Sequence, residues 1–397
     1  TLQLTTVRPS AYFIAMLTYP TAYVVDQANI ERLGRNWASR PNGTGPFKLR
    51  EYRIGERVVL ERNEFFYRGV AKLNRVEYIL SGGSAMAMYE NNEIDITGVV
   101  IADLDRVRDP RDPLNKDMRV TPPGFDVSYI GFNAARPPFD DVNVRRALNF
   151  ATNKDLIAKE ILAGLAIPAY GILPLGFPGY TGQAKGLNFD AARAREAMAN
   201  SKYAAPNAKE LLARYQQSQD PRVLEEFKAA TARRLPRIVL TVPGTGGGLG
   251  LDLEVIVEMW KQQLGVEVEF QQVEWATFLQ DLNAQKLQLF SGLGWQADYP
   301  DPQNFLDMLF HTQSDINHGA YSNTALDRVL EQARSEADWN KRVALYQQAE
   351  EMILQDAAWV PLWFSTEVPV LIKPWVKNYK LLPLIVPHMR QVFIEKG

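Results

Sequence analysis

The sequence has 397 residues, of which 46% are apolar and 23% are charged, and its formal net charge is −2. This length allows two or three domains, and the near-neutral charge gives no reason to expect nucleic acid or an anionic membrane surface as a partner. The absence of cysteine excludes disulfides, thiolate metal sites and a cysteine nucleophile.

The first hundred residues predict alternating strands and helices. We expect a strand over residues 1–6 and a short helix over 10–17. Residues 47–52 and 57–62 predict two strands of a hairpin, because a short glycine-containing loop joins them. A strand at 76–80, a helix at 84–91 and a strand at 93–100 are expected next. This alternation is typical of an α/β domain.

Two helices are predicted over residues 143–151 and 153–162, and Asn153 is suited to cap the second. The first carries Arg145 and Arg146, a pair that could bind an anion. We favour a solvated helix face instead, since paired surface charges are common there.

Residues 201–234 are rich in Ala, Lys, Glu, Gln and Arg, and predict surface helices inserted before a strand at 237–242. The glycine-rich stretch 244–250 follows that strand and precedes a helix at 253–264, a position typical of a phosphate cradle. Its spacing fits neither the Rossmann fingerprint nor the P-loop, so we interpret it as a flexible loop.

The most informative stretch is GWQADYPDP, from Gly294 to Pro302. Its two prolines forbid a helix and disfavour a central strand, so we expect a turn. A strand is predicted before it, at 286–290, and a helix after it, from 305. An acid in such a turn is suited to hold a cationic group.

The turn offers two acids, Asp298 and Asp301, with the aromatic residues Trp295 and Tyr299 beside them. Either carboxylate could instead cap the following helix, as Asp residues often do, and Asp301 is the better placed for that role. The spacing alone leaves both readings open.

The last part of the chain predicts two amphipathic helices within residues 324–355, with Asp338 as a cap. The extended segment 360–364 is expected to return to the first lobe. With an outward crossing near Ile130, this predicts a hinged protein of two lobes.

Three groups of motifs occur in order along the chain. They are GTGPF at 43–47 with RNEFFY at 62–67, then GFN at 131–133 with PPFDD at 137–141 and VRRAL at 144–148, and finally DYPDP at 298–302. In this order they resemble the family 5 extracellular solute-binding proteins of ABC importers, which include dipeptide-, oligopeptide- and nickel-binding proteins. The resemblance covers essentially the whole chain except the stretch 201–234.

The resemblance implies an α/β two-lobe periplasmic-binding-protein fold, type II-like in its two crossings. It divides the chain into a partial first lobe (1–130), a second lobe (131–362) with the helical insertion 201–234, and a return to the first lobe (363–397). Family members carry a substantial region before the segment that matches the start of this chain. We therefore expect the N-terminal part of the first lobe to be missing.

The resemblance also implies a ligand site. The first Asp of the turn, here Asp298, pairs with the ligand's α-ammonium in peptide-binding members. Backbone groups around Gly294, Trp295 and Gln296 would hydrogen-bond the peptide main chain, with Trp295 adding an apolar wall and a cation–π contact. Tyr299 completes the predicted ligand-binding set.

Catalytic and metal chemistry find little support in the sequence. No nucleophile, base and acid set is legible, and nothing supports the carboxylate separation that a glycosidase needs. His311 and His318 are seven residues apart, which matches no compact metal pattern. We expect no enzyme activity, no catalytic residues, no cofactor and no metal.

The predicted function is the capture of a small peptide, or another amine-bearing solute, between two lobes and its delivery to an ABC transporter permease. The expected place is extracytoplasmic, in the periplasm or on the outer face of the cell membrane, as for a lipoprotein. Membrane contact would come only through the permease or a lipid anchor absent from this chain. Oligosaccharide-, opine- or nickel-chelate-binding members of the family, and an intracellular ligand-sensing regulator with the same fold, remain alternatives.

Overall fold

A computed structural model describes residues 2–244, 246, 248–383 and 388–395. The chain forms two compact units, each built from separate stretches of sequence. Unit 1 comprises Thr1–Tyr19 and Gly124–Ser365, and unit 2 comprises Pro20–Pro123 and Thr366–Gly397. The assignment of residues 1–130, 131–362 and 363–397 to two lobes of a hinged protein stays a prediction.

Unit 1 is organised around a seven-stranded mixed sheet, in the order β7-β12-β6-β10-β8-β9 with β11 paired to β6. Its strands are β6 (Asp126–Phe132), β7 (Ala166–Pro168), β8 (Val239–Pro243), β9 (Glu269–Val273), β10 (Leu289–Phe290), β11 (Gly294–Gln296) and β12 (Trp359–Ser365). The neighbouring strands β6 and β12 are antiparallel and lie far apart in the sequence. The β8–β9 and β8–β10 pairs are parallel.

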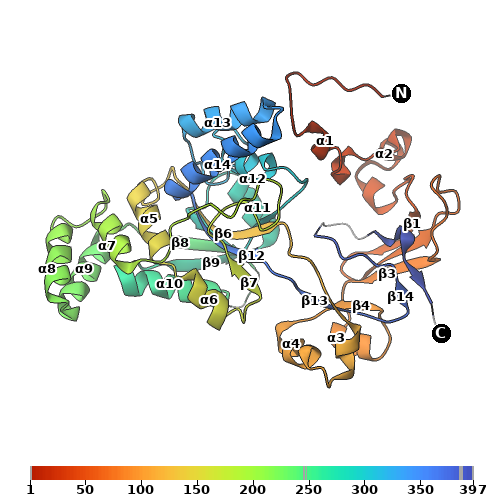
Figure 1. Ribbon diagram of the computed structural model, residues 1–397, viewed down its shortest axis with the longest axis horizontal. Helices are drawn as coiled ribbons and strands as arrows, with labels where there is room; N and C mark the ends of the chain where they lie inside the picture. Colours follow the sequence, from red (N-terminus) through yellow and green to blue (C-terminus); the bar gives the residue numbers. More distant parts are fainter. Residues whose placement is uncertain (1, 245, 247, 384–387, 396–397) are drawn as a thin grey trace. The chain divides into compact units, whose positions relative to one another are not determined.

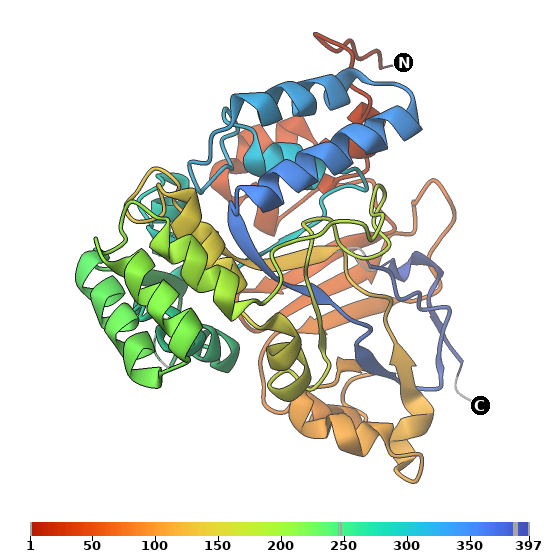
Figure 2. The same ribbon diagram turned by 60° about the vertical axis from the view of Figure 1, so that its left-hand side comes forward.

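Helices cover both faces of this sheet (Figures 1 and 2). One face is covered by α5 (Val142–Phe150), α6 (Lys154–Glu160), α7 (Ala191–Ala199) and α10 (Leu251–Leu264), and α8 (Ala208–Ser218) and α9 (Pro221–Arg234) pack against α7 and α10. The other packs against α11 (Trp275–Asn283), α12 (Gln303–Phe310), α13 (Thr324–Ser335) and α14 (Trp339–Gln355). The result is a three-layer α/β/α arrangement, which agrees with the predicted α/β class.

The two cores follow from the alternation of side chains along β6. Ile130 and Phe132 enter the core on the α5–α10 face, whereas Val127 and Tyr129 enter the core on the α11–α14 face. Successive side chains of a strand point to opposite faces, so a strand that is buried on both sides is apolar throughout.

The GFN motif has a packing explanation in this sheet. A side chain at Gly131 would place its Cβ 2.2 Å from the ring of Phe290 on β10, so only glycine fits. Asn133 is buried, and its side-chain amide donates hydrogen bonds of 2.8 and 3.1 Å to the carbonyls of Gln285 and Leu287. The motif therefore joins β6 to the chain that leads into β10.

The predicted helices at 201–234 are present as α8 and α9, which lie side by side next to α7 and α10 (Figure 1). They are more buried than their composition predicts. Leu211, Leu212, Val223 and Phe227 enter the hydrophobic core of the α5–α10 face. The two helices are thus packed against the rest of unit 1 through one apolar face each.

Unit 2 contains smaller sheets. The strands are β1 (Phe47–Arg53), β2 (Arg57–Arg62) and β3 (Arg75–Ile79) in one sheet, β4 (Ile96–Gly98), β13 (Pro369–Ile372) and β5 (Met118–Val120) in a second, and β14 (Val376–Lys377) with β15 (Phe393–Ile394) in a third. The helices are α2 (Gln27–Leu33), α3 (Ala85–Glu90) and α4 (Ile101–Arg108). A small core gathers around Tyr89 and Leu371.

Several local predictions are confirmed and two are wrong. The hairpin of β1 and β2 and the caps Asn153 and Asp338 are present. Residues 2–6 form no strand, and the helix that follows shrinks to α1 (Phe13–Met16). Arg145 does not lie on a solvated face. It is buried, and its guanidinium donates to the carbonyls of Phe139, Asp356 and Ala357.

Candidate functional site

The site begins where the sheet of unit 1 divides. Phe290 of β10 pairs with Gly131, but Gly294 of β11 pairs with Ser128, so four steps along one strand span three along β6. This is a β-bulge. Gly292 lies in the bulge at φ +81, and a Cβ there would come within 2.8 Å of Pro243, so the bend requires glycine.

The bulge opens a cavity of about 470 Å³ between β11 and the end of β8. Its walls include Leu249, Leu253, Leu362 and Trp363, and its polar side chains are Ser128, Asp252, Gln272 and Ser291. Ser291 donates to the carbonyl of Tyr129, and Gln272 donates to that of Gly248. Among the described lining residues, Asp252 is the one with a formal charge.

The strand β11 has one open edge. Among the residues that the structure describes, β6 is its sole strand partner, through the pairs Gly294–Ser128, Trp295–Val127 and Gln296–Asp126. Gly294 and Gln296 are exposed, and Trp295 is half-buried. An open edge presents backbone donors and acceptors that an extended peptide chain can pair with.

Asp298 stands just beyond the end of β11 and is half-buried. Its carboxylate accepts a hydrogen bond of 3.3 Å from Asn304 Nδ2 and another from the hydroxyl of Tyr19. That bond with Asp298 is the main reason why the pKa of Tyr19 is raised. In the described part of the chain no Lys, Arg or His forms an ion pair with Asp298. The carboxylate therefore has neutral partners.

Asn304 on α12 is the residue that holds the turn together, and the sequence interpretation missed it. It is fully buried, and its Oδ1 accepts from the backbone N–H of Asp298 at 2.9 Å and from Trp295 Nε1 at 3.2 Å. Its place two residues after the end of the motif, at Pro302, was a usable signal. Tyr19 lies far away in sequence and no pattern indicated it.

The aromatic residues of the turn have different surroundings. Trp295 is anchored by Asn304 and keeps part of its ring exposed. Tyr299 is buried, its hydroxyl donates to Gln303 Oε1 at 2.5 Å, and burial raises its pKa. Tyr299 therefore supports the turn from inside, and its contact with a solute stays a prediction. We call β11, Asp298 and the cavity with Asp252 the open rim.

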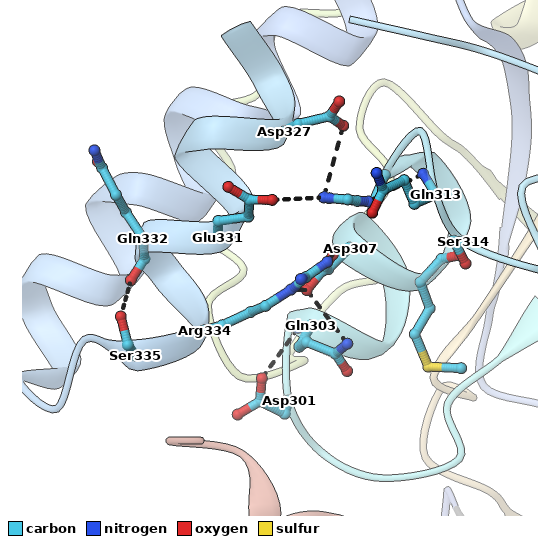
Figure 3. A network of polar contacts seen from close by, with 12 residues as sticks. Asp301, Gln303, Asp307, Gln313, Ser314, Asp327, Glu331, Gln332, Arg334 and Ser335 are labelled. Carbon is cyan, nitrogen blue, oxygen red and sulfur yellow. Dashed lines mark hydrogen bonds and ion pairs between the residues drawn. The ribbon is translucent and has the colours of Figure 1, made fainter. Parts of the chain in front are cut away.

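Beneath the turn lies a set of paired charges that we call the buried ion-pair layer: Asp301 with Arg342, and Asp307 with Arg334. Asp301 is 4% exposed, forms an ion pair with Arg342 of α14 and accepts from the backbone N–H of Gln303 at 3.0 Å. Burial raises the pKa of Asp301 and Arg342 opposes that rise. Figure 3 shows Gln303 linking Asp301 to Asp307.

The second pair of the layer is bidentate. Arg334 of α13 donates to the two oxygens of Asp307 at 2.6 and 2.7 Å (Figure 3). Asp307 is buried, while the Arg334 side chain is 24% exposed. Bidentate guanidinium–carboxylate pairs combine strength with fixed geometry. The layer therefore fixes α12 against α13 and α14, and with it the end of the turn, which leads into α12.

The histidines offer little for metal binding. His311 is buried, with Nδ1 accepting from the N–H of Gln313 and Nε2 facing Glu331 at 3.4 Å, and His318 contacts Asn283. Across the described residues, no group of three or more His, Asp or Glu side chains is arranged to hold a metal ion. The predicted glycine loop includes Thr245 and Gly247, which lie outside the described residues.

Comparisons with known proteins agree on one family. The model of the bacterial extracellular solute-binding proteins, family 5 (middle), matches residues 1–317. The periplasmic oligopeptide-binding protein OppA of Escherichia coli is 28% identical over 402 residues, which cover 100% of this chain and 69% of that protein. The probable deoxycholate-binding periplasmic protein YgiS of Escherichia coli is 30% identical, over 96% of this chain and 66% of that protein.

A solved structure shares the fold. The periplasmic binding protein DppA of Helicobacter pylori, in complex with the peptide STSA, has a TM-score of 0.78 at 24% sequence identity. The match covers 99% of this chain and 72% of that one. The predicted α/β binding-protein fold is thereby confirmed. Among the described residues, each helix is too short or too polar to cross a membrane.

Proposed function

Because this chain belongs to the bacterial extracellular solute-binding proteins of family 5, we propose that it captures a peptide and delivers it to the permease of an ABC transporter. The peptide's main chain pairs with the open edge of β11, and its α-ammonium binds the carboxylate of Asp298. The work of the protein is recognition and transfer of a solute, as the family assignment implies.

The observation that carries this proposal is the carboxylate at the end of an open strand edge. A peptide laid along β11 can form backbone hydrogen bonds without contributions from its side chains, which permits many sequences. The chain terminus of such a peptide would arrive beside Asp298, which follows β11 by two residues. A binding mode that uses both features recognises the backbone of the peptide and its amino terminus.

Charge supports the same assignment. An ammonium enclosed in a binding site needs an opposite charge, because an unpaired buried charge costs several kcal/mol. Asp298 supplies that charge, and its present partners, Tyr19 and Asn304, are neutral. The exposed part of Trp295 adds an apolar wall and a π face close to the same position.

The test uses Asp298→Asn, which keeps the shape of the side chain and removes its charge. Isothermal titration calorimetry with a tetra-alanine peptide should show binding weakened by roughly 2–5 kcal/mol. N-acetylation of the peptide should produce a similar loss with the wild-type protein and little further loss with the variant, since both changes remove one pair. Asp315→Asn, at an exposed position, is the matched control.

Equal affinity of free and acetylated peptide would remove the main support for an amine-bearing ligand. The oligosaccharide-, opine- and nickel-chelate-binding alternatives would then be favoured. The relative YgiS bears the name of a deoxycholate-binding protein, so a bile acid belongs in the same titration series. Strong binding of the bile acid together with no binding of peptides would contradict the proposal.

A further inference from the structure

The cavity beside β11 contains a carboxylate that the proposed function does not use. Asp252 belongs to the first turn of α10, and its carboxylate accepts a hydrogen bond of 3.2 Å from Trp363 Nε1. This is the one donor that the described residues give it. A carboxylate has about four lone-pair positions, so Asp252 can accept several more hydrogen bonds from a group in the cavity.

The surroundings of Asp252 favour a cation over an anion. The start of α10 contributes a partial positive charge of about half a unit, which the full negative charge of Asp252 outweighs. Within the described lining, therefore, the formal charge is negative.

The rest of the cavity suits a long amphipathic side chain. Leu249, Leu253, Leu362 and Trp363 provide apolar wall, and the volume of about 470 Å³ lies within the usual range of ligand pockets. Lysine and arginine cover apolar surface with their methylene stems and keep their charged ends on polar groups. The indole of Trp363 adds a face for a cation–π contact.

The position of the cavity relative to β11 sets which ligand residue reaches it. Asp298 lies beyond one end of β11, whereas Gly292, Leu293 and Gly294 at the other end line the cavity. A peptide whose ammonium is at Asp298 runs antiparallel to β11 and advances one residue for each residue of the strand. Its third or fourth residue then lies opposite Gly294 or Leu293.

We propose that this cavity is a side-chain pocket that selects lysine or arginine at about the third or fourth position of the bound peptide, with Asp252 as the residue that determines specificity. The inference rests on the proposed function, because the peptide direction depends on Asp298. It goes further by naming the class of peptide that binds most tightly.

The test compares tetrapeptides that carry lysine, norleucine or glutamate at position three or four in an alanine background. Calorimetry should show that the lysine peptide binds roughly tenfold more tightly than the norleucine peptide at the selected position. The glutamate peptide should bind more weakly than both. Asp252→Asn should bring the lysine peptide to the level of norleucine and leave the norleucine peptide unchanged.

Glu254→Gln is the matched control, because it removes an exposed acid from the same helical turn. It should leave the preference for lysine intact. Equal affinity of lysine and norleucine peptides for the wild-type protein would overturn the inference. So would an Asp252→Asn variant that still prefers lysine.

The failure of this inference can be distinguished from the failure of the proposed function. If tetra-alanine binds and loses affinity on N-acetylation, but lysine brings no advantage, the pocket assignment alone is wrong. If acetylation has no effect, or no tetrapeptide binds, the assignment of Asp298 fails and the pocket assignment falls with it.

Discussion

The buried ion-pair layer and the open rim meet at one turn, and they treat carboxylates in opposite ways. Asp301 and Asp307 are buried and each is paired with an arginine. Asp298 and Asp252 are half-buried, and their protein partners are the neutral groups of Tyr19, Asn304 and Trp363. The first region therefore fixes the geometry, and the second keeps negative charge available for a ligand.

This difference shows how a binding site can be rigid while its carboxylates lack a cationic partner. An unpaired carboxylate on a mobile loop would rearrange toward any nearby cation. Here Asn304 holds the backbone of Asp298 from α12, and the arginines hold α12 from α13 and α14. Because the buried ion-pair layer fixes α12, Asp298 in the open rim keeps its position without a cationic partner.

The largest effect is expected from Asp301→Asn. It leaves Arg342 buried without its counter-charge, and breaking a buried pair costs about 3–5 kcal/mol of folding free energy. Chemical denaturation should show this loss, whereas Asp315→Asn should change little. The sequence interpretation gave Asp301 a capping role that Asn could also fill. An unchanged denaturation midpoint would support that interpretation, and the proposed difference between the two regions would then be wrong.

A smaller loss is expected from Asp307→Asn. Its partner Arg334 is partly exposed and can regain water, so the free energy of unfolding should fall by about 1–3 kcal/mol. The same denaturation experiment measures it. A loss greater than that of Asp301→Asn would mean that the bidentate pair, rather than the more buried one, holds the layer.

Lys154 sharpens the comparison, because it is a buried ionisable group whose hydrogen-bond partners are neutral. Its amine donates to the carbonyls of Ala169 and Pro361, and burial lowers the pKa of Lys154 to about 7 from 10.5. Between these two pH values the unfolded chain binds a proton that the folded chain has released. Stability should therefore rise with pH across this window, by at most about 1.4 kcal/mol per unit.

Lys154→Met removes the titrating group and should remove that rise. Denaturation of both proteins at pH 7 and pH 9 measures the effect as the difference between them. If the stability of both proteins changes with pH in the same way, Lys154 keeps its proton in the folded state. The two carbonyls would then be sufficient to stabilise the ammonium.

The smallest effect on stability is expected from Asp298→Asn. Its neutral partners can bond to an amide as well, so the free energy of unfolding should change by less than about 0.5 kcal/mol. The same variant should lose most of its peptide affinity. A clear loss of stability would place Asp298 with the buried ion-pair layer and end the distinction between the regions.

Local sequence signals predicted those elements of the fold that depend on interactions between residues close in the sequence. The hairpin of β1 and β2 follows from alternation and a glycine loop, and the caps Asn153 and Asp338 from their side-chain oxygens. The prediction of a strand over residues 1–6 was wrong because a strand also depends on a partner that local sequence does not reveal. An extended pattern forms a strand only if another strand pairs with it, and in residues 2–6 none does.

The candidate site was predictable only in part. The turn with Asp298 and the residues of β11 are contiguous, and a motif can reveal them. Tyr19, Arg342 and Asp252 reach the same region from distant parts of the chain, and no spacing links them. Arg145 is instructive too, because its burial depends on carbonyls at the end of α14 that no local pattern discloses.

Finally, the pairing of β6 with β12 bears on when the protein can fold. Residues 126–132 obtain one of their two flanking neighbours only from 359–365, and β4 and β5 of unit 2 pair only once 369–372 are present. A chain emerging from the ribosome can complete neither sheet until residues 359–372 have been made. Such late closure suits a protein of an extracellular family, since the chain stays open for export. A chain ending at Asp356 lacks β12 and should therefore show no cooperative unfolding of unit 1 in thermal denaturation.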